Sequence, residues 1–97
     1  MRSVYLVAYD VCDPKRLRKT HMLMRGAGDP LQFSVFRCEL SDLEKQGLKD
    51  SLWEVLNLAQ DRVMLINLGP VDGRGNHCIE YWGDPLTGEP DRCAVVA

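Results

Sequence analysis

Val4-Tyr5-Leu6-Val7-Ala8-Tyr9 is an unbroken run of β-branched, aromatic and other apolar residues close to the start of the chain. Such a run predicts a strand that is buried on both faces and therefore lies in the middle of its sheet. The run ends at Asp10, and Asp13-Pro14 then places a helix N-cap directly before a proline at the first helical position. A helix is therefore expected from Pro14 to about Arg25, where two glycines follow.

Residues 31–40 carry two alternating apolar series that are out of phase with each other. The phase changes between Val35 and Phe36, which predicts a bulge or a break into two short strands. Ser41-Asp42-Leu43-Glu44 then matches a capping box, so a second helix is expected from this point to about Ala59.

The last third of the chain is richer in turn signals. Asp61 to Leu68 is dense in apolar residues and is closed by Gly69-Pro70, which predicts another strand. Residues 71–77 are expected to form a loop, Cys78 to Trp82 a short strand, and Arg92 to Ala97 a terminal strand. This order predicts an α+β fold with the helices packed on one face of a sheet. A chain of 97 residues is expected to form a single domain, residues 1–97.

Charge is unevenly distributed along the chain, although the net charge is only −2. Residues 1–40 carry seven Lys and Arg against four Asp and Glu, whereas residues 41–97 carry five against ten. The positive field of the first part favours nucleic acid as a partner more than the net charge suggests. The four cysteines show no CxxC pair or zinc-finger spacing, and the first apolar run is too short for a signal peptide or a membrane span. We therefore expect free thiols, a cytoplasmic location and no membrane partner.

Asp10 is the most informative candidate for chemistry, because it stands at the end of a buried strand and directly before a basic helix. Magnesium is commonly held by one or two carboxylates together with waters and substrate phosphates, so one aspartate alone is a poor site. In a two-fold dimer, however, a residue near the axis meets its own copy, and two Asp10 side chains can share a metal ion. The structural alternative is a turn residue that hydrogen-bonds the backbone.

The other candidates also have structural alternatives. Asp13 is explained by N-capping, with support of a metal ligand as the second interpretation. The basic residues from Lys15 to Lys19 form either a solvated face or a phosphate-binding surface, and their position at a helix start opposes the helix dipole, which favours a counter-anion. His21 is expected to be a packed or surface histidine. Aromatic residues on the strands either fill the core or stack on bases, and the chain contains no P-loop, GxGxxG, GxSxG or HExxH motif.

Several of these features occur together and in order over residues 3–70. They are the strand that ends in Tyr9-Asp10, the helix start Asp13-Pro14-Lys15-Arg16, the strand Gln32-Phe33-Ser34-Val35-Phe36 and the segment Asp61-Arg62-Val63. In this order the chain resembles the CRISPR-associated Cas2 family. The resemblance implies a ferredoxin-like homodimer that holds a divalent metal, usually Mg²⁺, between the two strand-end aspartates. It also implies metal-dependent endonuclease activity on RNA or double-stranded DNA, and partnership with the CRISPR integrase in spacer acquisition.

Carried over to this chain, the resemblance makes Asp10 the metal-binding and catalytic residue. It places nucleic-acid contacts at the basic residues of the first helix and at residues of the strands beside the site, namely Tyr9, Lys15, Arg16, Arg18, Lys19, Ser34 and Phe36. The core of the domain then spans residues 3–70. A segment of about residues 78–97 is expected to pair with the sheet of the partner subunit, with Arg92 to Val96 as its strand.

Three functions therefore compete. The first is a hydrolase in which a metal ion at the paired Asp10 residues activates water. The second is a non-catalytic DNA-binding dimer that bridges integrase subunits, with Arg16, Arg18 and Lys19 on the DNA. The third is a small-ligand regulatory domain of the same fold, whose binding would not depend on salt.

Overall fold

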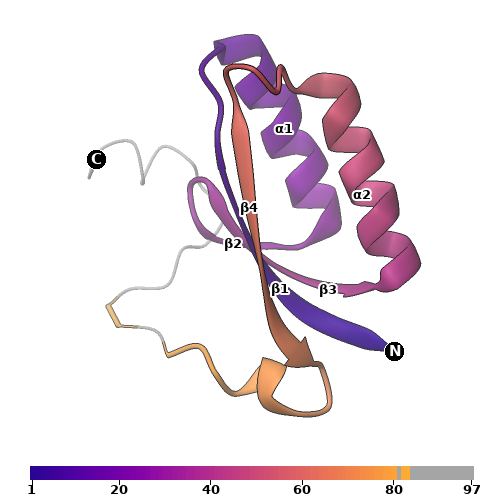
Figure 1. Cartoon of the computed structure of the whole chain (residues 1–97). Coiled ribbons are helices and arrows are strands. Elements are labelled where there is room, and N and C mark those ends of the chain that lie inside the picture. Colours follow the sequence, from indigo (N-terminus) through magenta and orange to yellow (C-terminus); the bar gives the residue numbers. More distant parts are fainter. Residues whose placement is uncertain (81, 84–97) are drawn as a thin grey trace.

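The computed structural model describes residues 1–80, 82 and 83, and within them two helices pack on one face of a four-stranded sheet (Figure 1). The elements are, in chain order, β1 (Arg2–Asp10), α1 (Pro14–Ala27), β2 (Asp29–Gln32), β3 (Val35–Ser41), α2 (Asp42–Val55), β4 (Arg62–Pro70) and the short 3-10 helix η1 (Arg74–Asn76). The strand order is β2-β3-β1-β4, and all neighbours are antiparallel. This arrangement confirms the ferredoxin-like α+β fold that the sequence predicts.

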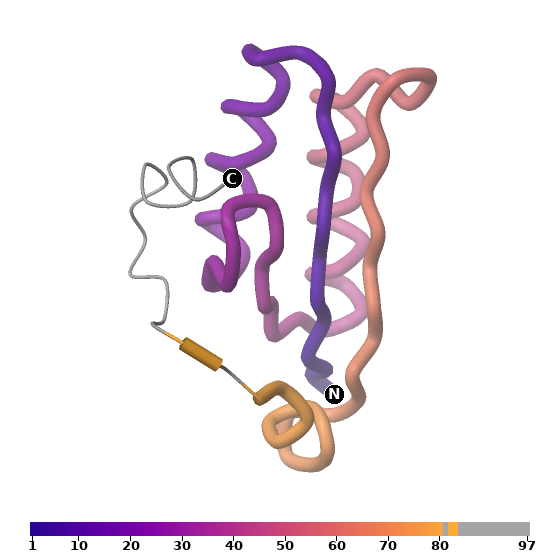
Figure 2. Tube along the Cα trace, turned by 90° about the vertical axis from the view of Figure 1, so that its left-hand side faces the viewer, coloured from indigo at the N-terminus to yellow at the C-terminus, as the bar shows by residue number. Residues whose placement is uncertain are grey.

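The strand β1 occupies the interior of the sheet, as its apolar composition predicts. The predicted burial on both faces is wrong for the single chain, because Leu6 and Ala8, on the face that the helices do not cover, are only partly buried. It pairs with β3 on one side and with β4 on the other, and Figure 2 shows β1 and β4 running side by side along their lengths. Its residues Tyr5, Val7 and Tyr9 are buried. They form one core with residues of β3 and of the helices, which are Phe36, Cys38, Leu40, Met24, Leu52 and Leu56. The alternating residues Phe36, Cys38 and Leu40 of β3 thus lie on the face that the helices cover.

Both helices begin where their capping residues predict. The Asp13 side chain accepts a hydrogen bond of 2.9 Å from the Arg16 amide, and Ser41 and Glu44 form the complete capping box. The second helix nevertheless ends at Val55, not near Ala59. Beyond that point side chains satisfy the backbone, since the Asn57 side chain accepts from the Ala59 amide at 3.0 Å and offers an alternative to the helical hydrogen bond.

The structure contains the break that the sequence predicts between Val35 and Phe36, but the break lies two residues earlier. The chain turns at Phe33 and Ser34, between β2 and β3, and the Ser34 carbonyl accepts a hydrogen bond of 3.1 Å from the Tyr9 amide near the end of β1. The prediction of a strand at Cys78 to Trp82 is wrong for the residues that can be compared, since 78–80 and 82 adopt no strand. The predicted strand at 92–97 lies outside the described residues. Within those residues no helix is long and apolar enough to cross a membrane.

The end of α1 depends on a close approach at Gly28. A Cβ atom at this position would lie 2.6 Å from Cys38 Sγ and would overlap the Arg37 carbonyl oxygen of β3. Gly28→Ala is therefore expected to lower the free energy of unfolding by about 1–3 kcal/mol, because the backbone must move. Gly26→Ala is the control: its Cβ meets nothing within 4 Å, and it should raise that free energy by up to about 1 kcal/mol. Urea unfolding of both variants measures the contrast, and equal effects would contradict it.

Candidate functional site

Asp10 lies at the end of β1 on the face of the sheet that the helices leave uncovered. Its cross-strand partner is Arg62 of β4, and the distance from Arg62 Nε to Asp10 Oδ2 is 4.0 Å. The Asp10 side chain is 75% exposed and that of Arg62 is 85% exposed. An ion pair this open contributes little to stability, so the Asp10 carboxylate remains available to a ligand.

The uncovered face beside Asp10 is apolar. Because residues opposite each other in an antiparallel sheet share a face, Leu6 and Ala8 of β1 lie beside Ile66 and Met64 of β4. Met64 is 57% exposed and Ile66 is 41% exposed, whereas the next residue of this row, Val4, is fully buried. We call the set Leu6, Ala8, Met64 and Ile66 the apolar patch.

The short helix η1 explains why the patch stops before Val4. It lies at the end of the sheet where β1 begins (Figure 1), and Gly75 approaches so closely that a Cβ there would be 2.9 Å from Val4 Cγ2. Asn76 accepts a hydrogen bond from the Arg37 side chain, which ties η1 to β3. The part of the face that remains open is therefore the part that ends at Asp10.

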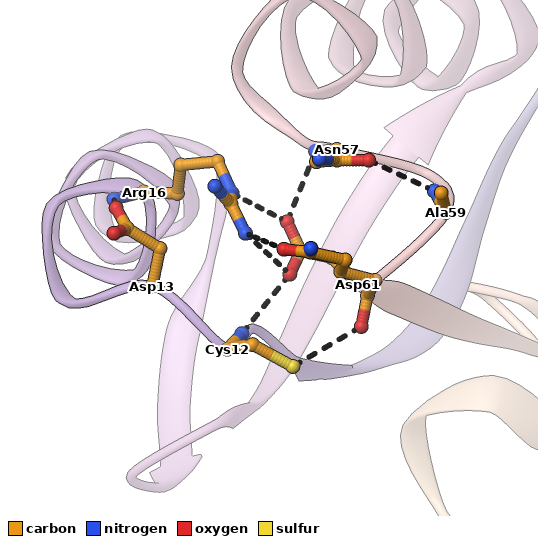
Figure 3. Close-up of polar contacts among 7 residues, drawn as sticks. Cys12, Asp13, Arg16, Asn57, Ala59 and Asp61 are labelled. Carbon is orange, nitrogen blue, oxygen red and sulfur yellow. Dashed lines mark hydrogen bonds and ion pairs between the residues drawn. The ribbon is translucent and has the colours of Figure 1, made fainter.

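A buried ion pair lies next to this strand end. The Asp61 side chain is fully buried and accepts hydrogen bonds from Arg16 Nε at 2.8 Å and from an Arg16 terminal nitrogen at 3.2 Å (Figure 3). It also accepts from the Cys12 amide and from the Asn57 amide, each at 3.0 Å. The Arg16 hydrogen bond, with the help of these amides, holds the pKa of Asp61 well below its usual range and raises that of Arg16.

The basic residues from Lys15 to Lys19 therefore divide into two groups. Lys15, Arg18 and Lys19 are exposed, and the helix contains no acidic residue that would neutralise them. Arg16 is only 24% exposed and its guanidinium group is engaged by Asp61. The first three fit phosphate binding, and Arg16 in this structure serves the fold.

Tyr9 and Phe36 are enclosed by the core. Phe36 is fully buried, and the Tyr9 hydroxyl lies 2.9 Å from His21 Nδ1. Burial raises the pKa of Tyr9 to about 12, and desolvation, with a smaller effect of Arg25, lowers the pKa of His21. His21 stacks on Phe33 with ring centroids 5.3 Å apart, so of the two alternatives, a packed or a surface histidine, the structure shows the packed one. In this conformation neither Tyr9 nor Phe36 presents a ring on which a base can stack, and Ser34 meets β1 through its carbonyl group.

Asp10 alone does not complete a metal site. Among the described residues of one chain, no three His, Cys, Asp or Glu side chains are grouped so that they could hold a metal ion. The donor type nevertheless fits, because an exposed carboxylate is a ligand that Mg²⁺ prefers. A metal ion at Asp10 would need further ligands, and Asp10 lies at the border of the exposed apolar patch.

Two residues of this neighbourhood are not among the candidates that sequence reasoning selects. Arg62 becomes visible only through the register of β1 and β4, which places it opposite Asp10. In the sequence, Asp61 is the first residue of a predicted strand. Its ion-pair partner Arg16 is 45 residues away, so the sequence does not indicate the pair. The one local signal is a charged pair, Asp61-Arg62, directly before an apolar strand.

Comparison with known proteins gives a consistent result. The family described as CRISPR associated protein Cas2 matches residues 2–72. The CRISPR-associated endoribonuclease Cas2 1 of Rhodospirillum rubrum is 37% identical over 68 residues, which cover 70% of this chain and 67% of that protein. The CRISPR-associated endoribonuclease Cas2 2 of Thermodesulfovibrio yellowstonii is 39% identical over 86 residues, with 89% of this chain and 91% of the relative covered.

Solved structures agree with the sequence comparison. A crystal structure of a hypothetical protein from Thermus thermophilus superposes with a TM-score of 0.73 at 30% identity, covering 92% of this chain and 100% of the other. The crystal structure of Streptococcus pyogenes Cas2 superposes with a TM-score of 0.71 at 29% identity, covering 82% of this chain and 99% of the other. By the family match, by these relatives and by its fold, the chain belongs to the CRISPR associated protein Cas2 family.

Proposed function

We propose that this protein is a metal-dependent endoribonuclease of a CRISPR system, active as a homodimer in which the two Asp10 side chains hold Mg²⁺. The names of its relatives support the nuclease activity and favour RNA as the first substrate to test, since the Rhodospirillum and Thermodesulfovibrio proteins are called endoribonucleases. Double-stranded DNA is the second substrate, because a Thermus thermophilus relative at 33% identity is called an endonuclease without that restriction.

The dimer is supported by the composition of β1. Its sequence is apolar on both faces, yet only one face is covered by helices, and Leu6 and Ala8 on the other face remain partly exposed beside Met64 and Ile66. A strand of this kind normally lies in a sheet that is covered on both sides. A second copy that packs face to face on the apolar patch covers it and brings the two Asp10 residues toward the two-fold axis.

Each residue of the site has a defined task in this proposal. Asp10 and its copy in the partner bind the metal ion, whose positive charge offsets the repulsion between the two carboxylates. When bound, Mg²⁺ supplies the positive charge that makes a water molecule more acidic and stabilises charge on the scissile phosphate. Lys15, Arg18 and Lys19 bind the flanking phosphates and orient the substrate. Arg62 lies beside Asp10 and offers a further positive charge.

The observation that carries the proposal is the exposed Asp10 carboxylate at the border of the apolar patch. Its test is an incubation of the purified protein with labelled single-stranded RNA and duplex DNA, in Mg²⁺ and in EDTA, together with sedimentation analysis of the mass. Cleavage that requires Mg²⁺ and a dimeric mass are the expected results. A monomeric protein, or cleavage that persists in EDTA, would contradict the proposal.

The second candidate function is the non-catalytic DNA-binding dimer that bridges CRISPR integrase subunits in the cytoplasm. It is favoured by the exposed Lys15, Arg18 and Lys19 of α1, a helix that contains no acidic residue. It uses the same basic residues of α1, so duplex binding without cleavage, and capture of the integrase by the wild-type dimer, would support it. The small-ligand regulatory domain has no comparable observation behind it.

Binding of nucleic acid distinguishes Arg18 from Arg16. Arg18→Ala is expected to reduce the slope of log Kd against log salt concentration by about 2, because it removes one phosphate contact from each subunit of the dimer. Arg16→Gln should leave that slope unchanged and lower Tm, because its guanidinium is already paired with Asp61. Fluorescence anisotropy with a labelled duplex in EDTA, where cleavage is excluded, measures both. A loss of slope in Arg16→Gln equal to that in Arg18→Ala would show that Arg16 leaves Asp61 to bind phosphate.

A further inference from the structure

We propose that Asp61 is a positioning residue, whose buried carboxylate fixes the backbone on both sides of Asp10 and thereby directs the Asp10 side chain toward its ligand. The inference rests on the function proposed above and adds to it a residue that does not touch the metal ion or the substrate. It also makes Arg16 a positioning residue, because Arg16 holds the Asp61 carboxylate in place.

The need for positioning follows from the exposure of Asp10. Within the described residues its side chain forms one ion pair, with Arg62 at 4.0 Å, and no hydrogen bond, and it is 75% exposed. Contacts this weak do not hold a side chain in one place. Its direction must therefore come from the backbone, at a point where β1 ends and the chain turns toward α1.

Asp61 controls that backbone from two sides. Cys12, two residues beyond Asp10, donates its amide to Asp61 Oδ1 at 3.0 Å (Figure 3). Arg62, the cross-strand partner of Asp10, is covalently next to Asp61. The Cys12 thiol adds a hydrogen bond of 3.2 Å to the Gln60 carbonyl. The turn after Asp10 and the start of β4 are thus joined into one unit, and Asp61 is its common acceptor.

The carboxylate is also held from the opposite direction. Arg16 in the first turn of α1 contacts both of its oxygens, at 2.8 Å and 3.2 Å, and the Asn57 amide beyond α2 donates at 3.0 Å. A two-pronged guanidinium contact has a fixed planar geometry, which a single hydrogen bond lacks. A fully buried charge survives only when it is compensated in this way, so the four hydrogen bonds form a rigid junction between three chain segments.

The experiment compares the full-length wild-type protein with Asp61→Asn, Arg16→Gln and Glu44→Gln. Glu44 pairs with Arg2 in an exposed ion pair at the other end of β1, so Glu44→Gln removes a pair without touching the junction. Two quantities are measured at a temperature where each variant is folded. They are the hydrogen-exchange rate of the Cys12 amide by NMR and the dissociation constant for Mn²⁺ alone by electron paramagnetic resonance.

Asp61→Asn is expected to speed exchange of the Cys12 amide by about 10²-fold relative to core amides such as that of Val7, because its acceptor is weakened. The dissociation constant for Mn²⁺ should rise by about 10-fold, as for the loss of a residue that orients a metal ligand. Arg16→Gln should move both quantities in the same direction by less, since the amide contacts remain. If Asp61→Asn does not fold, the inference is tested with Arg16→Gln instead. Glu44→Gln should match the wild type.

The inference would be overturned if the folded variants had the exchange rates and the Mn²⁺ affinity of the wild type and differed from it only by a lower Tm. A merely structural ion pair gives that result. A wild-type dimer that binds no Mn²⁺ would instead refute the metal site of the proposed function. In that case the Cys12 amide still decides whether Asp61 holds the strand end, so the two failures are distinguishable.

Discussion

Replacement of Asp10 by asparagine is expected to lower the rate of Mg²⁺-dependent RNA cleavage by about 10³-fold or more, because several kcal/mol of transition-state stabilisation by the metal ion are lost. In a symmetric dimer the substitution removes both proposed ligands at once. The amide group keeps the shape of the side chain and cannot supply the negative charge that a hard divalent cation requires.

The fold should not change in this variant. Asp10 is largely exposed and its one ion pair, with Arg62, is long and open to solvent, so its loss contributes little to stability. The matched control is Asp13→Asn, because asparagine caps a helix as well as aspartate does and Asp13 stands only three residues away. Gel assays of labelled RNA, with sedimentation to confirm the mass, measure the effect.

The result also separates the two candidate functions. Loss of cleavage with intact duplex binding supports catalysis at Asp10. Cleavage by Asp10→Asn at the rate of the wild type would place the chemistry elsewhere. If the wild-type protein cleaves neither substrate and Asp10→Asn still binds duplex DNA, the non-catalytic dimer that bridges integrase subunits is the better account.

The second large effect is expected from Ile66→Glu in the apolar patch. Ile66 is 41% exposed in the single chain, so a glutamate there is tolerated by the monomer. In a face-to-face dimer each copy buries one unpaired charge, and two such penalties of about 2 kcal/mol raise the dimer dissociation constant by about 10³-fold. Cleavage should fall with it, since the second Asp10 is lost when the subunits separate.

The control for this variant is Leu43→Glu. Leu43 is 83% exposed on α2, on the side of the sheet opposite the patch, and its substitution should leave the mass unchanged. Sedimentation equilibrium of both variants over a range of concentrations measures the dissociation constant. A dimeric Ile66→Glu protein would show that the subunits meet through another surface, and the pairing of the two Asp10 residues would then have to be abandoned.

Local signals in the sequence were sufficient for the framework. The apolar run of β1 requires an interior strand, the Asp13-Pro14 pair sets the start of α1, and the Ser41 capping box sets the start of α2. All three act through residues within a few positions of each other, so they are readable before the chain is folded. The end of α2 was misplaced because Asn57 stops the helix through a side-chain hydrogen bond that competes with it.

The candidate site could be read from the sequence only in part. Asp10 is recognisable because strand-end position and residue type suffice to select it, and the exposed positions of Lys15, Arg18 and Lys19 follow from helical spacing. The pairing of Arg16 with Asp61 does not follow from helical spacing. Arg16 lies in the same basic run as the exposed residues, and its partner is 45 residues away. For Phe36 the sequence leaves core packing and base stacking both open, and its complete burial under the helices decides for the core.

The amino-acid order therefore accounts for the elements, the central strand and the strand-end carboxylate, because these depend on short-range periodicity and capping. The tertiary structure determines which charged side chains are paired and which face of the sheet stays exposed. Arg16 and Asp61, Asp10 and Arg62, and η1 against Val4 are each brought together by sheet register or by packing between distant segments. Such contacts depend on distances through space, and no local pattern in the chain encodes them.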